Sequence, residues 1–500
     1  MRIRKYQNYK NKQVEKNQVL KKFKGVLVDQ YEEFDIAVKK AAEEFGKIDK
    51  KEVIRVVSHL DADGISACSL MLKLLNIDNR KYSVSTVQQL NPAVLEQLAL
   101  EPYNYFIFTD IGSGAINEIK TILKGKKVFI LDHHSFEETK ELDNIVLVNP
   151  HTCGIDGGKE ISGAGVVFRF VCAVDKNMEE FAHIAIIGAI GDLQEQNGFL
   201  RLNREILKIA VEKNKIKVMK GLRIFGSQTK PLHKALEYCT DPFIPGVSGS
   251  ESGAIQFLNQ IGIDPKNGSG WKKIVHLDDD EMKKLVTGII MKRLNEAKPD
   301  DVLGDIYILP HEEEESPTRD AKEFATLLNA CGRLGRASLG IGACLGDKKI
   351  KQQAIRSLGD YKKEIVSALN WYHENKFTDD VFWGSGFVII NARDKVMSTM
   401  IGTLASILSK SNVMTNNTFI LSMAQAVEGN TKISLRTTNN LDGRLDLRNI
   451  IGEIINGIGN SEAGGHQNAA GAVIPTDKEN AFINSAKEVL GKFAMEERIS

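Results

Sequence analysis

The chain has 500 residues, 42% hydrophobic and 26% charged, a composition typical of a folded protein with two or three domains. Lys and Arg total 66 against 65 Asp and Glu, so net charge alone would not attract a polyanion, and a nucleic-acid partner would need a local basic patch. The six cysteines are scattered without a CxxC pair, so neither a zinc ribbon nor a disulfide framework is indicated, and we predict reduced thiols. No apolar run reaches the roughly 18 residues that span a bilayer, so we expect no membrane partner and a cytoplasmic protein.

The first residues of the sequence are strongly basic. Residues 1 to about 25 contain nine Lys or Arg against the single acid Glu15. Two interpretations stay open, a solvated tail or helix face and an arm that contacts nucleic acid. Helical periodicity follows from Tyr31 to Phe45, so we assign residues 1–45 to a basic segment and a helix.

Strand-like apolar runs and helical patterns alternate after residue 50. The strand-like runs are VIRVVSH, YNYFIFTD, KKVFILDHH and NIVLVNP, and the helical runs are SACSLMLKLLN, GAINEIKTILKG and EEFAHIAIIGAIGD. Alternating β and α units are typical of a mainly parallel sheet flanked by helices, in which function collects at the carboxyl ends of the strands. We therefore predict an α/β domain over residues 46–240.

Three further segments follow this domain. Gly- and Ser-rich sequence after Pro242 and a helical pattern up to Leu294 predict a mainly helical insert at residues 241–310, with three open roles: binding a partner, guiding a strand or bracing a cleft. We expect connecting helices, including the segment LLNACGRLGRASLG, at residues 311–375. Strand-like runs in VFWGSGFVIINARD, NTFILSMAQA, TKISLRTT and AAGAVIP predict a smaller α/β domain at residues 376–500.

The run VIRVVSHLDADG places polar side chains where a buried strand should end. His59, Asp61 and Asp63 stand at alternate positions, and Gly64 follows directly. An EF-hand loop is excluded, because it needs a third oxygen ligand before the glycine and a glutamate at its twelfth position, where this sequence has Leu72. We interpret the three side chains as donors on one short turn, with Gly64 letting the backbone bend away from bound ions.

Further donors stand at the ends of later elements. TDIGSG places Asp110 after a strand, LDHH places Asp132, His133 and His134 after another, and Asp192 closes the helical run IIGAIGD. Each alone would usually be a helix cap, a turn residue or a core or surface histidine. Together, carboxylates and imidazoles at several element ends of one domain favour neutralisation by divalent ions.

These motifs occur in the order of a known family. HLDADG, TDIGSG, LDHH and GAIGD resemble the DHH phosphoesterase superfamily, and GGHQNAAGAVI and SLRT resemble its DHH-associated C-terminal domain. LLNACGRLGRASLG is similar to the Asn-Ala-x-Gly-Arg segment of RecJ nucleases, in particular the archaeal branch. The resemblance covers residues 50 to 475 and implies a DHH domain, a helical insert and a DHH-associated domain, with the active site in the cleft between domains.

The resemblance also implies two Mn²⁺ or Mg²⁺ ions. One ion would be held by His59, Asp61 and Asp110, and the other by Asp63, Asp110, His133 and Asp192, with Asp110 bridging. Oxygen donors suit hard cations and the imidazoles favour Mn²⁺, and two such ions can share a water and lower its pKa. For His134 two roles stay open, contact with the scissile phosphate or leaving oxygen, which we favour, and support through Asp132, which we read as an outer residue.

A second set of residues is expected to bind substrate phosphates. The adjacent glycines Gly464 and Gly465 would expose backbone amides to a phosphate, with a plain glycine-rich turn as the alternative. The resemblance makes His466 a phosphate contact near the metals. In RecJ-like enzymes the positions of Arg333, Ser434 and Arg436 form a pocket for the terminal 5′-phosphate, and arginine forks suit that role. If so, the pocket sets the direction of cleavage.

The expected function is a two-metal-dependent exonuclease on single-stranded DNA in DNA replication or repair. It would act 5′ to 3′ and release nucleoside 5′-monophosphates. Rival readings within the superfamily are action on RNA, on short oligonucleotides or from the 3′ end, and the sequence does not separate DNA from RNA. Members of this branch associate with the GINS complex, so the alternative from a different functional class is a replication scaffold. A scaffold, however, has no need to keep all six proposed ligands.

Overall fold

The structure is a computed structural model that describes residues 29–136, 142–196, 198–240, 242–296, 298–410, 414, 417–426, 429–438, 445–459 and 461–499, without the side chains of 462, 466 and 496–499. The basic segment predicted at the start of the chain lies outside these residues. The chain forms two compact units. The first comprises Met1–Lys220, Asp305–Asn329 and Gly340–Asp347, and the second comprises Gly221–Gly304, Ala330–Leu339 and Lys348–Ser500.

The first unit is built on a five-stranded parallel sheet, in the order β2-β1-β3-β4-β5. Its strands are β1 (Val53–His59), β2 (Lys81–Val87), β3 (Tyr105–Thr109), β4 (Lys127–Leu131) and β5 (Ile145–Val148). The predicted α/β class with a mainly parallel sheet is confirmed. The sequence reading missed β2, because this edge strand is partly exposed along its length and alternates apolar with Ser, Thr and Lys residues.

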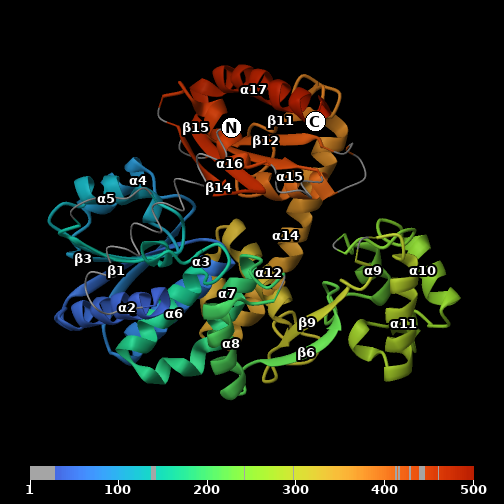
Figure 1. Cartoon of the computed structure of the whole chain (residues 1–500), viewed down its shortest axis with the longest axis horizontal. Helices are drawn as coiled ribbons and strands as arrows, with labels where there is room; N and C mark the ends of the chain where they lie inside the picture. Colours follow the sequence, from blue (N-terminus) through green and yellow to red (C-terminus); the bar gives the residue numbers. More distant parts are fainter. Residues whose placement is uncertain are drawn as a thin grey trace. The chain divides into compact units, whose positions relative to one another are not determined.

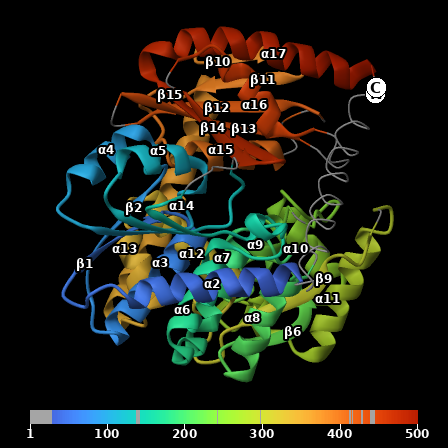
Figure 2. The same cartoon turned by 60° about the vertical axis from the view of Figure 1, so that its left-hand side comes forward.

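Helices cover both faces of this sheet (Figure 1). They are α2 (Gln30–Gly46), α3 (Ala62–Ile77), α4 (Pro92–Leu100), α5 (Ile116–Ile122), α6 (Gly163–Val174), α7 (Ala182–Gly191) and α8 (Arg201–Glu212), with 3-10 turns at Ser113–Ala115, Pro150–Cys153 and Lys176–Phe181. On one face α4 and α5 bury Leu95 and Ile119 against Phe106 and Phe108 of β3. On the other face α2 packs on α6, as Figure 2 also shows, and Phe45 contacts Phe129 edge to face. α12 (Ala321–Arg333) and α13 (Ala337–Cys344) contribute residues to both units.

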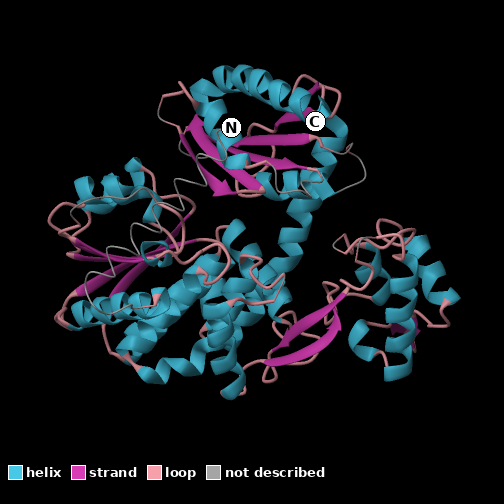
Figure 3. Cartoon of the chain, in the orientation of Figure 1, coloured by secondary structure: helices cyan, strands magenta, loops and turns pink. Residues whose placement is uncertain are grey.

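The second unit contains a helical segment with its own core. β6 (Lys217–Leu222) and β9 (Leu303–Ile308) pair with each other at the two ends of this segment. Between them lie α9 (Leu232–Glu237), α10 (Glu251–Gln260), the small hairpin β7 (Lys266–Asn267) and β8 (Gly270–Trp271), the turn Ile274–His276, and α11 (Asp279–Lys292). Leu236, Phe257, Leu285 and Ile289 meet in its interior, and Figure 3 shows that helices dominate it, as predicted for the insert.

A six-stranded mixed sheet forms the C-terminal part of the second unit, in the order β10-β11-β12-β13-β15-β14. Its elements are α14 (Lys348–Asn375), β10 (Val381–Gly384), β11 (Phe387–Asn391), α15 (Ile401–Lys410), β12 (Phe419–Gln425), β13 (Asn430–Thr437), α16 (Leu447–Ile455), β14 (Glu462–His466), β15 (Ala469–Pro475), a turn at Thr476–Lys478 and α17 (Glu479–Ile499). α16 and α17 pack on one face and α14 and α15 on the other, which matches the predicted smaller α/β domain. Within the described ranges, none of the helices combines the length and the apolar composition that a membrane span requires.

Candidate active site

Three neighbouring strands of the first unit end in donor side chains. His59 is the last residue of β1, Asp110 follows β3 and Asp132 follows β4. Because β1, β3 and β4 run parallel and pair in this order, their carboxyl ends meet at one edge of the sheet. This is the edge at which ligands bind in open α/β sheets.

One group of donors consists of His59, Asp61 and Asp110. His59 Nδ1 lies 3.1 Å from Asp61 Oδ2 and 3.7 Å from Asp110 Oδ2. Asp61 is the N-cap of α3, and its Oδ1 accepts a hydrogen bond from the backbone N–H of Gly64 at 3.0 Å. The expectation that Gly64 bends the backbone away is wrong: Gly64 lies in the first turn of α3, where a Cβ would stand 2.3 Å from the carbonyl oxygen of His59. Glycine is needed there for close packing of helix against strand.

A second group consists of Asp63, His133 and Asp192. His133 Nε2 lies 3.8 Å from Asp63 Oδ2 and 3.2 Å from Asp192 Oδ2. Both oxygens of Asp63 accept backbone N–H groups at the start of α6, from Gly163 at 2.6 Å and Ala164 at 3.0 Å. The positive end of the α6 dipole thus stabilises a buried carboxylate.

Asp110 lies between the two groups. Its Oδ1 is 3.3 Å from His133 Nε2, while its Oδ2 faces His59. The residue is buried and adopts a left-handed φ of 57°, which is rare for side chains other than Asn, Asp and Gly. An aspartate therefore suits the backbone of this turn while it places a carboxylate between the two groups.

The tautomer of His133 is fixed by the backbone. Nδ1 lies 2.8 Å from the carbonyl oxygen of Gly157, which can only accept, so Nδ1 carries a proton. The other nitrogen, Nε2, is buried, and it has no hydrogen-bond partner among the described residues. In neutral imidazole it holds a lone pair aimed at carboxylate oxygens that also hold lone pairs, an arrangement that a cation between them would stabilise.

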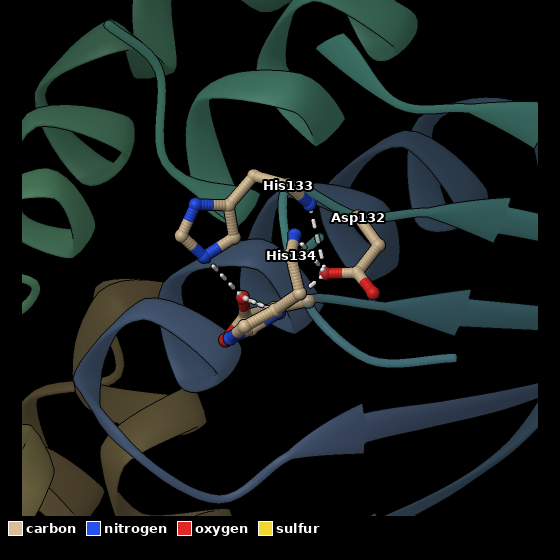
Figure 4. A group of neighbouring side chains, drawn as sticks. Asp132, His133 and His134 are labelled. Atoms are coloured by element: carbon tan, nitrogen blue, oxygen red, sulfur yellow. Dashed lines mark hydrogen bonds and ion pairs between the residues drawn. The ribbon is translucent and has the colours of Figure 1, made fainter. Parts of the chain in front are cut away.

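Asp132 and His134 form a separate pair beside these groups. Figure 4 shows that the Asp132 carboxylate and the His133 ring lie on opposite sides of the backbone. Asp132 Oδ1 accepts hydrogen bonds from the His133 N–H at 2.8 Å and from His134 Nδ1 at 2.7 Å, and Oδ2 accepts the N–H of Ser113 at 2.9 Å. Asn149 donates to the carbonyl of His134 at 2.9 Å, which anchors the strand end. Asp132 therefore orients His134.

The crowded charges shift the pKa values of several donors. Burial, with the nearby charges of Asp110 and Asp192, raises the pKa of Asp63 well above its usual range, and burial raises the pKa of Asp192 to about 7. Burial alone would lower the pKa of His59 and His133, but the adjacent carboxylates raise both. The raised pKa values show that negative charge is concentrated at this site, and oxygen-rich donor sets with imidazole fit Mn²⁺ or Mg²⁺.

The structure adds supporting residues that sequence reasoning missed. Gly157 and Gly163 lie in a loop and at a helix start far along the chain from the motifs, so spacing gave no signal, although Gly163 does follow a Ser helix cap. Gln194 stands only two residues after Asp192. Asn329 Oδ1 accepts the N–H of Ala62 at 3.0 Å, between Asp61 and Asp63. The sequence did offer a signal for Asn329, because this residue begins the Asn-Ala-x-Gly-Arg segment that also contains Arg333.

Of the predicted phosphate-binding residues of the second unit, Arg333, Ser434 and Arg436 lie near one another. Arg333 Nη1 donates to Thr403 Oγ1 and, at 3.2 Å, to the hydroxyl of Tyr361. Arg436 Nε donates to Ser406 Oγ at 3.0 Å. Burial, together with the charge of Arg333, lowers the pKa of the Arg436 guanidinium to about 10, so the two cations are neighbours.

The surroundings of these arginines are built from neutral groups. A Cβ on Gly402, at the start of α15, would lie 2.9 Å from Ser434 Oγ and 3.5 Å from Arg436 Nη2. Among the described residues, neither Arg333 nor Arg436 forms an ion pair with a carboxylate. Two partly buried guanidinium groups without acids favour an anionic ligand.

The adjacent glycines Gly464 and Gly465 lie in a strand and not in a turn. β14 contains Gly464 and Gly465, which pair with Gly471 and Ala470 of β15. Both glycines are exposed, and Gly465 has a φ of 129° that favours glycine. The side chain of His466 lies outside the described residues, so its predicted phosphate contact stays a prediction.

Comparison with known proteins identifies the domains. Residues 53–191 match the DHH family, N-terminal domain, residues 224–306 the DHH-CID domain, and residues 385–492 the DHHA1 domain. An uncharacterized protein of Methanocaldococcus jannaschii is 33% identical over 448 residues, or 88% of this chain and 93% of that protein. The single-stranded-DNA-specific exonuclease RecJ of Bacillus subtilis is 28% identical over 177 residues, which cover 33% of this chain and 22% of that protein.

Solved structures show the same fold. RecJ from Thermus thermophilus, in complex with Mn²⁺, superposes with a TM-score of 0.56 at 16% identity, covering 91% of this chain and 55% of that one. CDC45 from Entamoeba histolytica superposes with a TM-score of 0.58 at 10% identity, covering 93% of this chain and 100% of that one. The family predicted from the sequence motifs is confirmed: the chain belongs to the DHH phosphoesterase superfamily and is a RecJ-like member with DHH, DHH-CID and DHHA1 domains in this order.

Proposed function

We propose that this protein is a metal-dependent exonuclease that hydrolyses single-stranded DNA from the 5′ end, as a nuclease of DNA replication or repair. The observation that carries the proposal is the buried Nε2 of His133, which lies 3.2 to 3.8 Å from carboxylate oxygens of Asp63, Asp110 and Asp192 and forms a well-aligned hydrogen bond with none of them among the described residues. A structural histidine would normally have both ring nitrogens satisfied. A cation site explains the arrangement.

The ligands would fall into the two groups that the structure forms. His59, Asp61 and Asp110 would hold one Mn²⁺ or Mg²⁺, and Asp63, Asp110, His133 and Asp192 the other. When bound, such ions supply Lewis acidity, a water of lowered pKa and compensation of phosphate charge. RecJ from Thermus thermophilus shares this fold, and its structure was solved in complex with Mn²⁺, which supports the choice of ion.

His134 would act on the substrate rather than on the ions. Its Nδ1 is engaged by Asp132, so the contact to a phosphate or leaving oxygen would involve Nε2. The charge of Asp132 outweighs the effect of burial and raises the pKa of His134, which favours the protonated ring that can donate a proton. Asp132 would hold that ring in position.

Direction would come from the arginine pair. Arg333 and Arg436, with Ser434 and Gly402 beside them, suit a terminal phosphate, which carries more charge than a diester. Cleavage that breaks the bond to the 3′-oxygen of the first nucleotide leaves a new 5′-phosphate on the remaining strand. Each cycle would therefore regenerate the group that the pocket binds, and release one nucleoside 5′-monophosphate.

The test is a time course with Mn²⁺ on matched single-stranded DNA and RNA, internally labelled and carrying either a 5′-phosphate or a 5′-hydroxyl. Mononucleotides released first from the 5′ end of DNA, and lost in Asp61→Ala, would support the proposal. A preference for RNA, for short oligonucleotides or for 3′ ends would retain the metal site and overturn the substrate.

The alternative is a replication scaffold bound to a GINS complex. The fold is shared with both RecJ and CDC45, so fold does not separate the two functions. The complete donor set favours the enzyme, since a scaffold gains nothing from burying uncompensated carboxylates. Activity no greater than that of Asp61→Ala in the same time course would instead favour the scaffold.

A further inference from the structure

The carbonyl oxygen of Gly157 accepts two side-chain hydrogen bonds. One comes from His133 Nδ1 at 2.8 Å and the other from Gln194 Nε2 at 3.0 Å. Gly157 lies in the loop before α6, where no helix or strand orients its carbonyl. The loop passes so close to the end of β4 that a Cβ on Gly157 would be 2.1 Å from the carbonyl oxygen of His133. Side chains must therefore hold the Gly157 carbonyl in place.

Gln194 is itself held from several directions. Its side chain is buried, and Oε1 accepts a hydrogen bond from Asn203 Nδ2 at 2.6 Å. Because Oε1 is occupied by this donor, the amide presents its N–H groups to Gly157 and, at 3.5 Å, to the carbonyl of Ile161. The orientation of the Gln194 amide thus depends on Asn203.

Gln194 also belongs to the turn that carries Asp192. α7 ends in a Schellman motif, in which the N–H of Leu193 bonds to the carbonyl of Ile190 and the N–H of Gln194 to that of Ala189, both at 3.0 Å. Leu193 adopts a left-handed φ of 59°, a strained conformation for leucine. The strained turn sends Asp192 toward His133 Nε2 and Gln194 toward the carbonyl that binds His133 Nδ1.

We propose that Gln194 is a positioning residue for the metal centre, which holds the Gly157 carbonyl so that His133 keeps Nδ1 protonated and directs Nε2 at Asp63, Asp110 and Asp192. The inference rests on the proposed function, since it requires that these donors bind a divalent ion. Residues that orient metal ligands in this way typically contribute about 10- to 100-fold in metal affinity.

The test compares Mn²⁺ binding to metal-free full-length chains. Gln194→Met keeps the length of the side chain and removes its hydrogen bonds. Gln196→Met is the matched control, because Gln196 lies in the same turn with an exposed side chain. Bound and free Mn²⁺ are separated by electron paramagnetic resonance, and stability in EDTA is followed by urea unfolding. We expect Gln194→Met to bind the His133-side ion about tenfold more weakly than Gln196→Met does.

Asn203→Leu provides a second variant that leaves Gln194 in place. Oδ1 of Asn203 is buried without a partner among the described residues, so leucine loses one hydrogen bond but also removes an unsatisfied oxygen, and the fold should tolerate it. Its expected effect is a smaller, few-fold loss of Mn²⁺ affinity, because the Gln194 amide can rotate. If Gln194 only stabilised the fold, the two variants would lower the free energy of unfolding and leave the Mn²⁺ affinity of the folded protein unchanged.

The outcomes distinguish a failure of the proposed metal centre from a failure of the proposed role of Gln194. Wild-type protein that binds no Mn²⁺ would overturn the metal centre and this role of Gln194 with it. Wild-type binding that Gln194→Met and Asn203→Leu both retain at the level of Gln196→Met would overturn the role of Gln194 alone. If Gln194→Met does not fold, the Asn203→Leu affinity decides.

Discussion

The backbone of Gly163 lies against the carboxylate of Asp110: a Cβ on Gly163 would stand 2.3 Å from Asp110 Oδ1. The same residue donates its N–H to Asp63 at 2.6 Å. The start of α6 therefore touches one carboxylate and binds another, and only glycine allows both. This contact connects a helix that no motif marks to the centre of the donor cluster.

Gly163→Ala should disturb that contact. The methyl group must displace Asp110 or the first turn of α6, and we expect a loss of about 1–3 kcal/mol in the free energy of unfolding together with weaker Mn²⁺ binding. Urea unfolding and a Mn²⁺ titration measure the two effects. Gly114→Ala is the control, since a Cβ there meets nothing within 4 Å. Equal behaviour of the two variants would contradict the packing argument.

Asp110→Asn should abolish hydrolysis and keep the fold. Asparagine has the shape of aspartate and tolerates the left-handed φ of 57°, but it removes the charge that faces His59 and His133. In EDTA we expect the variant to be more stable than wild type, by on the order of 1 kcal/mol, because fewer carboxylates crowd one site. Asp110→Ala would add strain of about 1–2 kcal/mol, so it is the poorer test. Mn²⁺-dependent activity retained by Asp110→Asn would argue against a shared ligand.

The sequence was enough to predict that certain donor side chains lie together at strand ends. His59, Asp110 and His133 follow apolar runs, and parallel strands bring their carboxyl ends together whatever the rest of the chain does. The sequence also predicted the sheet class, because buried strands and helices differ in periodicity. It missed β2, whose edge position permits polar side chains on both faces.

Other features depend on contacts between distant segments. The sequence did not indicate the role of Gly64, because the carbonyl of His59 becomes its neighbour only when α3 packs on β1. Likewise Asp63 meets Gly163 across a hundred residues, and Gly157 meets Gln194 through a side-chain amide. Such tertiary hydrogen bonds leave no periodic trace in the sequence.

Arg436→Ala should reduce the preference for substrates with a 5′-phosphate over those with a 5′-hydroxyl. Charge-assisted hydrogen bonds contribute roughly 1.5–3 kcal/mol, so we expect the ratio of kcat/KM values to fall about tenfold or more. Arg448→Ala is a matched control on α16, where the arginine is exposed and pairs with Asp446 at 2.6 Å. An unchanged ratio in Arg436→Ala would remove this arginine from end recognition.

The metal-free protein should lose stability as the pH rises. Asp192, with a pKa of about 7 in the folded chain against 3.8 as the ordinary value, keeps a proton that the unfolded chain has released, so its contribution is lost between these two values. The raised pKa values of His59, His133 and Asp63 act in the same direction. Urea unfolding in EDTA at about pH 5.5 and about pH 8 should show a decrease approaching 1.4 kcal/mol per pH unit for each retained proton. Mn²⁺ should cancel the decrease, because metal binding replaces those protons and strengthens with pH. In EDTA, the free energy of unfolding of Asp192→Asn should fall less steeply with pH than that of wild type. An equally steep fall would show that Asp192 does not retain a proton in the metal-free protein.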